Sequence, residues 1–180
     1  VRDQETGPGS AASTVGDQDA LSFLISREHY LQWQPEASGP YARAGRFYAP
    51  YGLRLADHNS YVRRYLGFNL MEETYGLSAG YVKSDWEGHF TAYVTDPWRG
   101  NGRQEVGVAA LYEKRSGNLV LAAQSKVGVA DADVRALAGG YAKYWLDGTK
   151  LMLMGQLDAG RQWFREVDGG DRWQLAGYLG

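Results

Sequence analysis

The feature that most constrains this chain is a regular alternation of apolar and polar residues between residues 75 and 160. In the clearest stretch, one parity holds Trp86, Gly88, Phe90, Ala92 and Val94, and the other holds Glu87, His89, Thr91, Tyr93 and Thr95. Successive side chains of a β-strand point to opposite faces, so this stretch predicts a strand with one apolar and one polar face. The pattern returns after each turn signal, which indicates a sheet of consecutive long strands.

The alternation predicts nine strands, which follow a polar, aperiodic arm at residues 1–19. These strands cover 20–34, 41–51, 66–83, 86–96, 105–115, 119–130, 134–146, 150–164 and 173–179. Short connections alternate with longer ones, the short set at 36–39, 84–85, 116–118 and 147–149 and the longer set at 54–64, 97–104, 131–133 and 166–172. Asp-Gly and Gly-Asn pairs in the short set are typical of hairpins. We therefore expect an antiparallel all-β domain over residues 20–180.

Connection lengths and composition together favour a transmembrane β-barrel. Short turns that alternate with longer loops are the arrangement of outer-membrane barrels. The chain has 13 Tyr and 6 Trp, whose rings favour a boundary between apolar and wet surroundings. Its mean hydropathy of −0.46 fits a barrel, because only alternate strand residues face lipid. We expect an antiparallel transmembrane β-barrel, or a large part of one, in the outer membrane of a Gram-negative bacterium.

The number of predicted strands points to an incomplete sheet. Bacterial single-chain barrels use an even number of strands, whereas this pattern gives nine. The last predicted strand, 173–179, runs almost to the final residue, Gly180, so the pattern stops in mid-strand. Two open sheet edges would expose rows of unpaired backbone groups. We therefore expect missing strands or a partner chain to complete the sheet.

Aromatic residues lie close to several predicted strand ends. In a barrel, Tyr and Trp at such positions form girdles at the two membrane interfaces. The alternative is the ordinary enrichment of aromatic residues in sheets. The predicted girdle residues are Tyr30, Trp33, Tyr41, Trp86, Tyr112, Trp145 and Trp163.

The most distinctive stretch runs from Gly45 to Ser60 and places charged residues among tyrosines. If it folds into the lumen of a barrel, it would form a constriction that selects solutes by charge. The alternative is a solvated external loop in which Asp57 and Asn59 form turn hydrogen bonds. The predicted constriction and lumen residues are Arg46, Arg54, Asp57, His58, Arg63, Arg64, Glu87, His89, Lys126, Lys143 and Asp158.

The strand–turn–strand rhythm over about residues 40–180, with Gly-Arg-Phe and Tyr-Gly leading into a polar loop, resembles porin-like outer-membrane proteins. This resemblance implies a conduit for small polar solutes that works by diffusion, with the lipid bilayer as its partner. The odd strand count adds other envelope protein chains or further barrel strands as expected partners. Two alternatives stay open: a structural or anchoring barrel subunit of a bacterial envelope assembly, and a soluble β-sandwich or lipocalin-like binding protein. The net charge of −2 gives no strong electrostatic signal for nucleic acid, so no nucleic-acid partner is expected.

Catalytic and metal sites find little support in the sequence. Ser60, His58 and the downstream Asn69 could in principle form a catalytic set of nucleophile, base and orienting residue. The surrounding sequence does not match such a site. The histidines lack paired ligand spacing, there is no cysteine, and Asp131 and Asp133 favour a plain turn. We expect no enzymatic activity, no metal and no cofactor.

The alternation also predicts how single positions respond to substitution. Leu121 is predicted to face lipid, so Leu121→Arg should cost about 2–4 kcal/mol. Gln124 is predicted to face the lumen, where replacement by Arg should be nearly harmless.

Overall fold

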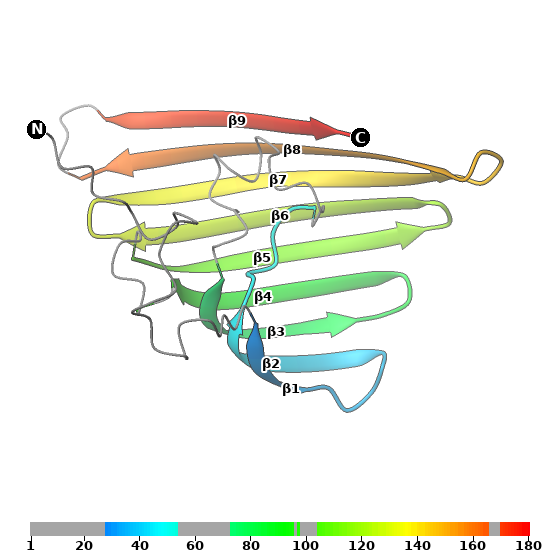
Figure 1. Ribbon diagram of the computed structural model, residues 1–180, viewed down its shortest axis with the longest axis horizontal. Helices are drawn as coiled ribbons and strands as arrows, with labels where there is room; N and C mark the ends of the chain where they lie inside the picture. Colours follow the sequence, from blue (N-terminus) through cyan, green and yellow to red (C-terminus); the bar gives the residue numbers. More distant parts are fainter. Residues whose placement is uncertain (1–27, 54–72, 96, 98–103, 166–169) are drawn as a thin grey trace, which may run out of the picture.

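The computed structural model describes residues 28–53, 73–95, 97, 104–165 and 170–180. Within these ranges the chain forms one antiparallel sheet of nine strands (Figure 1). No helix in the described ranges is long and apolar enough to cross a membrane. The strands are β1 (His29–Trp33), β2 (Gly39–Phe47), β3 (Thr74–Val82), β4 (Trp86–Thr95), β5 (Glu105–Ser116), β6 (Leu119–Ala130), β7 (Asp133–Leu146), β8 (Leu151–Phe164) and β9 (Asp171–Leu179).

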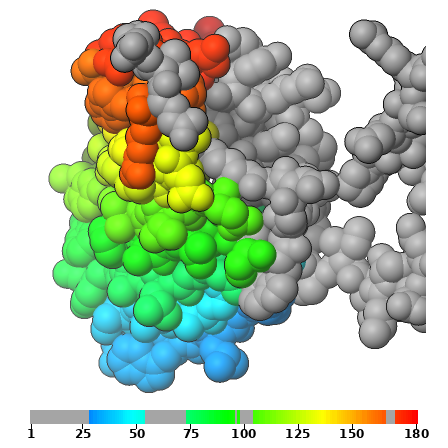
Figure 2. Space-filling view, turned by 90° about the vertical axis from the view of Figure 1, so that its left-hand side faces the viewer, coloured from blue at the N-terminus to red at the C-terminus, as the bar shows by residue number. Residues whose placement is uncertain are grey.

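The strands lie in the sheet in chain order, and each pairs antiparallel with the next. The end-on view shows the same order as successive bands from β1 in blue to β9 in red (Figure 2). The β1–β2, β3–β4, β5–β6 and β7–β8 connections gather at the right-hand end in Figure 1. In the β5–β6 turn, Gly117 has a φ of 55°, a left-handed conformation that glycine adopts readily.

Predicted and observed strands agree best from β4 to β8, whose ends lie within one residue of the predicted ranges. The predicted longer connection after β6 is wrong, because only residues 131–132 join β6 to β7. The predicted strand at 41–51 is also wrong at its end, because β2 stops at Phe47. Pro50 has no N–H for a strand ladder and Gly52 has a φ of 73°, so the chain leaves the sheet here.

The sheet is not closed, contrary to the predicted barrel. Among the described residues, β1 pairs only with β2 and β9 only with β8, so both are edge strands. In a meander each strand reverses direction, and the first and ninth strands therefore run the same way. An entirely antiparallel barrel needs an even number of strands. Nine strands with this connectivity would need a parallel pair at the seam.

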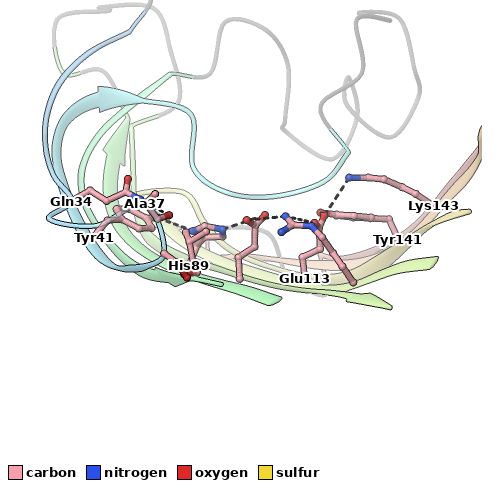
Figure 3. Close-up of polar contacts among 11 residues, drawn as sticks. Gln34, Ala37, Tyr41, His89, Glu113, Tyr141 and Lys143 are labelled. Atoms are coloured by element: carbon pink, nitrogen blue, oxygen red, sulfur yellow. Dashed lines mark hydrogen bonds and ion pairs between the residues drawn. The ribbon is translucent and has the colours of Figure 1, made fainter. Parts of the chain in front are cut away.

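The sheet is curved, and its two faces differ sharply in character. We call concave the face that carries Tyr41, His89, Glu113, Tyr141 and Lys143 (Figure 3). The opposite, convex face carries the apolar parity of the strands. Its exposed large side chains include Leu31, Leu77, Phe90, Val108, Leu121, Val127, Leu153, Leu157 and Leu175.

Burial is inverted between the two faces of this sheet. Leu121, Leu153 and Phe90 are each 53% exposed, so the apolar parity does not enclose a dry interior. On the concave face, by contrast, Thr91 and Asp158 have no exposed surface. Large apolar side chains are ordinarily buried and polar ones exposed. In the described part of the sheet, the concave face therefore buries polar side chains together with a few apolar ones such as Phe47 and Leu137, and the convex face exposes large apolar side chains.

Candidate functional site

A continuous chain of polar contacts crosses the concave face from β2 to β7 (Figure 3). Its first half starts at Tyr41, whose hydroxyl lies 2.7 Å from Nδ1 of His89. Nε2 of His89 lies 3.7 Å from Oε1 of Glu87 on the same strand. The second oxygen of Glu87 accepts from Arg115 on β5, 3.0 Å away.

The second half of this chain is centred on Glu113. Arg115 bridges the two carboxylates, because it also lies 2.8 Å from Oε1 of Glu113. Oε2 of Glu113 accepts from the hydroxyl of Tyr141 at 2.6 Å and from Nζ of Lys143 at 3.2 Å. Glu113 is 4% exposed. Its burial is compatible with a charge because donors surround both of its oxygens.

Residues 48–53, which follow β2, pass over the concave face and bind strands far away in the chain (Figure 3). The hydroxyl of Tyr51 donates to Oδ1 of Asp158 at 2.9 Å. The backbone N–H groups of Gly52 and Leu53 donate to side-chain oxygens of Gln124 and Gln156, each at 2.7 Å. We call residues 48–53 the inserted segment.

Asp158 anchors the inserted segment from β8. Besides Tyr51, its carboxylate accepts from the amide nitrogens of Gln124, at 2.7 Å, and of Gln156. Each glutamine thus accepts from the inserted segment and donates to the same carboxylate. Burial, together with the charge and hydrogen bond of Asp158, raises the pKa of Tyr51 well above its usual range. The tyrosine hydroxyl therefore stays protonated and keeps donating.

The buried position of Gln124 overturns one prediction. Gln124 is 5% exposed and has hydrogen bonds to both Gly52 and Asp158. Gln124→Arg would break these bonds and place a longer cation in a filled space, so it is not a harmless substitution. The alternation predicted correctly which face of the sheet carries Gln124. It could not predict that the inserted segment covers this residue.

A third buried carboxylate, Glu105, lies on the concave face at the start of β5. Oε1 of Glu105 accepts from the hydroxyl of Tyr93 at 2.5 Å and lies 3.8 Å from Nζ of Lys126. Its other oxygen lies 3.1 Å from Arg135 on β7. This group joins β4, β5, β6 and β7 in one charged network. Removing one member would leave a buried charge without its counterpart.

Glycines make room for the large side chains that lie flat on the concave face. A Cβ on Gly80 would meet the ring of Tyr41, and one on Gly107 would meet the hydroxyl of Tyr93. A Cβ on Gly139 would meet Oδ1 of Asp158 and the backbone oxygen of Leu157. Part of the high glycine content thus serves close packing beneath polar side chains.

Gly139→Ala should destabilise the fold by about 1–3 kcal/mol, because the added methyl group overlaps Asp158 and the β8 backbone. The matched control is Gly148→Ala in the β7–β8 turn, where nothing lies within 4 Å of the added Cβ. Urea unfolding of both variants under identical conditions measures the difference in the free energy of unfolding. Equal stability of the two variants would contradict this packing.

Between the polar chain and the inserted segment lies an open pocket of about 490 Å³. Its walls include Arg43, Leu53, Leu111, Glu113 and Arg115. Charged and apolar side chains thus border the same space. A pocket of this size can hold a small organic molecule.

Of the predicted lumen residues that the structure describes, only some lie on the concave face. Glu87, His89, Lys126, Lys143 and Asp158 all lie on the concave face. Arg46 instead pairs with Tyr75 on the convex parity, and its guanidinium lies 3.5 Å from Glu73. The remaining predicted residues, Arg54, Asp57, His58, Arg63 and Arg64, lie outside the described residues.

The predicted girdle residues divide between the two faces. Trp33, Trp86, Tyr112 and Trp163 lie on the convex parity. Tyr30, Tyr41 and Trp145 lie on the concave parity, where Tyr30 contacts Phe47 and Tyr41 contacts His89. Proximity to a strand end therefore did not identify the face.

Convex aromatic residues nevertheless gather at both ends of the strands. Near the short turns, Trp86 packs between Tyr81 and Tyr112, with ring centroids 5.5 and 5.9 Å apart. Near the other end, Arg161 lies 5.0 Å from the ring of Trp163 and 4.9 Å from that of Trp173. The sequence prediction missed Tyr81 and Trp173, although their parity places them on the apolar face.

The sequence prediction also missed several residues of the concave face. Some of them lie on the polar parity of a strand, whereas others lie outside the alternation. Glu113, Arg115 and Tyr141 share the polar parity of their strands, so continuing the alternation would have identified them. Tyr51 was predicted only as the last residue of the strand at 41–51, and Leu53 had no periodic signal. Comparisons with known protein families, with curated proteins and with solved structures find no match to this chain.

Proposed function

We propose that this chain forms the wall of a β-barrel in a bacterial outer membrane and lines a porin-like conduit for small polar solutes. The observation that carries this proposal is the inverted burial of the sheet. Leu77, Leu157 and Leu175 on the convex face are 68%, 61% and 71% exposed, whereas Glu105 and Asp158 on the concave face are 1% and 0% exposed. This sidedness matches a surface that faces hydrocarbon outside and water inside.

The aromatic residues at both ends of the convex face support the same proposal. Tyr and Trp rings favour the membrane–water interface, with their apolar bodies in lipid and polar tips in water. Lys83 lies 5.6 and 5.7 Å from the rings of Tyr81 and Trp86, and Arg161 lies between two tryptophans. Cations at the ends of an apolar band can reach the interface with their charged groups.

A conduit requires closure, and the described strands do not provide it. An open sheet edge cannot lie in hydrocarbon, because its backbone N–H and C=O groups would lack partners. We therefore propose that further strands or another envelope chain pair with β1 and β9. Solutes would then pass by diffusion and electrostatic selection rather than by catalysis.

Conductance of the purified protein in planar lipid bilayers tests the conduit. We expect discrete, salt-dependent current steps once the protein has inserted. If the protein keeps its sheet content in vesicles but gives no current steps, the conduit is excluded. The proposal that the chain forms the wall of a membrane barrel would then still stand. Recovery of folded, monodisperse protein in buffer without detergent would exclude both membrane proposals and favour the soluble binding protein.

A structural or anchoring subunit is the second candidate, and the inserted segment favours it. Residues 51–53 are held on the concave face by hydrogen bonds that they donate to side chains of β6 and β8, and there they would narrow the proposed conduit. A barrel whose interior is filled in this way can be a stable anchor without carrying solute. The bilayer recording separates this candidate from the conduit.

A further inference from the structure

One cationic side chain in the wall of the concave pocket, Arg43, takes no part in the chain of polar contacts. The charged walls of this pocket are the cations Arg43, Arg115 and Lys143 and the carboxylates Glu87 and Glu113. Arg115 pairs with both carboxylates, and Lys143 pairs with Glu113. In the described part of the chain, no carboxylate pairs with Arg43. The pocket therefore holds one positive charge more than the ion pairs account for.

Arg43 is held in place by aromatic rings. Its guanidinium carbon lies 4.0 Å from the ring centroid of Phe47 and 4.9 Å from that of Tyr30. Phe47 is fully buried, so it provides a fixed surface beneath the cation. Nε of Arg43 is itself buried and has no hydrogen-bond acceptor among the described residues. The described residues therefore supply no acceptor that competes with a ligand for this guanidinium.

We infer that this pocket binds a small organic carboxylate, with its carboxylate group on Arg43 and its hydrocarbon body against Leu53 and Leu111. A guanidinium presents a planar fork of donors that matches a carboxylate in a bidentate arrangement. Leu53 and Leu111 border the same pocket and offer apolar contact beyond the charged group. A carboxylate on a single aromatic ring fits within the pocket volume of about 490 Å³.

The inference names the solute class of the proposed conduit and depends on that proposal for its physiological meaning. Binding itself requires neither a membrane potential nor ion flow. The two ideas can therefore fail separately. If the bilayer recording shows no current steps, the conduit is excluded, but measured binding would still support the carboxylate site. If no binding is measured, the carboxylate site is excluded, even if the protein conducts.

Fluorine NMR titration of the purified protein in detergent micelles tests the site, with 4-fluorobenzoate as the probe and empty micelles as the blank. We expect saturable binding, and binding weaker by about tenfold or more for the neutral isostere 4-fluorobenzamide, which lacks the charge-assisted pair. Inorganic phosphate should displace the probe only at concentrations about tenfold higher, because it has no apolar body. Equal binding of the amide, or equal competition by phosphate, would overturn the assignment.

Variants locate the site within the chain. Arg43→Gln should weaken 4-fluorobenzoate binding by about tenfold or more, and Arg43→Lys should bind with intermediate affinity because it keeps the charge but loses the fork. Arg161→Gln is the matched control, since Arg161 lies on the convex face and pairs with Asp171, and its affinity should stay at the wild-type value. Unchanged binding by a folded Arg43→Gln protein contradicts the inference. If that variant does not fold, the comparison of benzoate with benzamide on the wild-type chain still decides it.

Discussion

Leu157→Arg should destabilise the protein in lipid vesicles by about 2–4 kcal/mol, because it places a cation at the middle of the proposed hydrocarbon-facing surface. Leu157 lies on the convex face, midway along β8, and pairs with Gly140 and Gly177 on the neighbouring strands. Its side chain is 61% exposed and contributes little to packing within the sheet. The expected loss therefore comes from the surroundings of the sheet rather than from a cavity.

Leu151→Arg is the matched control for this prediction. Leu151 has the same parity on the same strand and is 57% exposed, but it lies at the first residue of β8, beside a turn. The cost of a cation falls to about 0–1 kcal/mol near the membrane interface. Urea unfolding of both variants in vesicles measures the difference in the free energy of unfolding. Equal small losses at the two sites would show that water, not lipid, covers the convex face.

Asp158→Ala should cost about 3–5 kcal/mol of folding free energy, because it leaves three buried donors without their acceptor. The donors come from Tyr51, Gln124 and Gln156, and Asp158 itself has no exposed surface. The inserted segment loses its anchor at the same time. In the bilayer recording, we therefore expect larger current steps from this variant than from the wild type.

Asp171→Ala separates this effect from the loss of an ordinary ion pair. Asp171 pairs with Arg161, but the two side chains are 40% and 36% exposed. Such a pair contributes about 0–1 kcal/mol, and its loss should leave the current steps unchanged. A variant Asp158→Ala that is as stable as Asp171→Ala would contradict the anchoring role of Asp158. Unchanged current steps from a folded Asp158→Ala protein would show that the inserted segment does not narrow the conduit.

The accuracy of the sequence prediction followed the purity of the alternation. β4, β5 and β6 alternate with few exceptions, and their ends and faces were predicted closely. The prediction was poorer where β2 ends, because Tyr48 and Ala49 continue the strand-like composition until Pro50 and Gly52. Strand propensity is a local property that does not show where a strand loses its partner.

The candidate site was predicted in part. His89 and Asp158 were identified because they lie on the polar parity of well-formed strands. Arg46 was assigned by its neighbourhood in the sequence rather than by parity, and the structure places it on the convex parity beside Tyr75. The unused charge of Arg43 could not be predicted, since it depends on which cations Glu87 and Glu113 bind across the sheet.

The sequence alone determined that this chain is a meander of strands with one apolar and one polar face. That property has a period of two residues and is complete within each strand. The tertiary structure decided that β1 and β9 remain edges, that residues 48–53 lie on the polar face, and that Asp158 holds them there. These outcomes depend on strand number, register and contacts between residues as far apart as Tyr51 and Asp158, and no local pattern encodes such contacts.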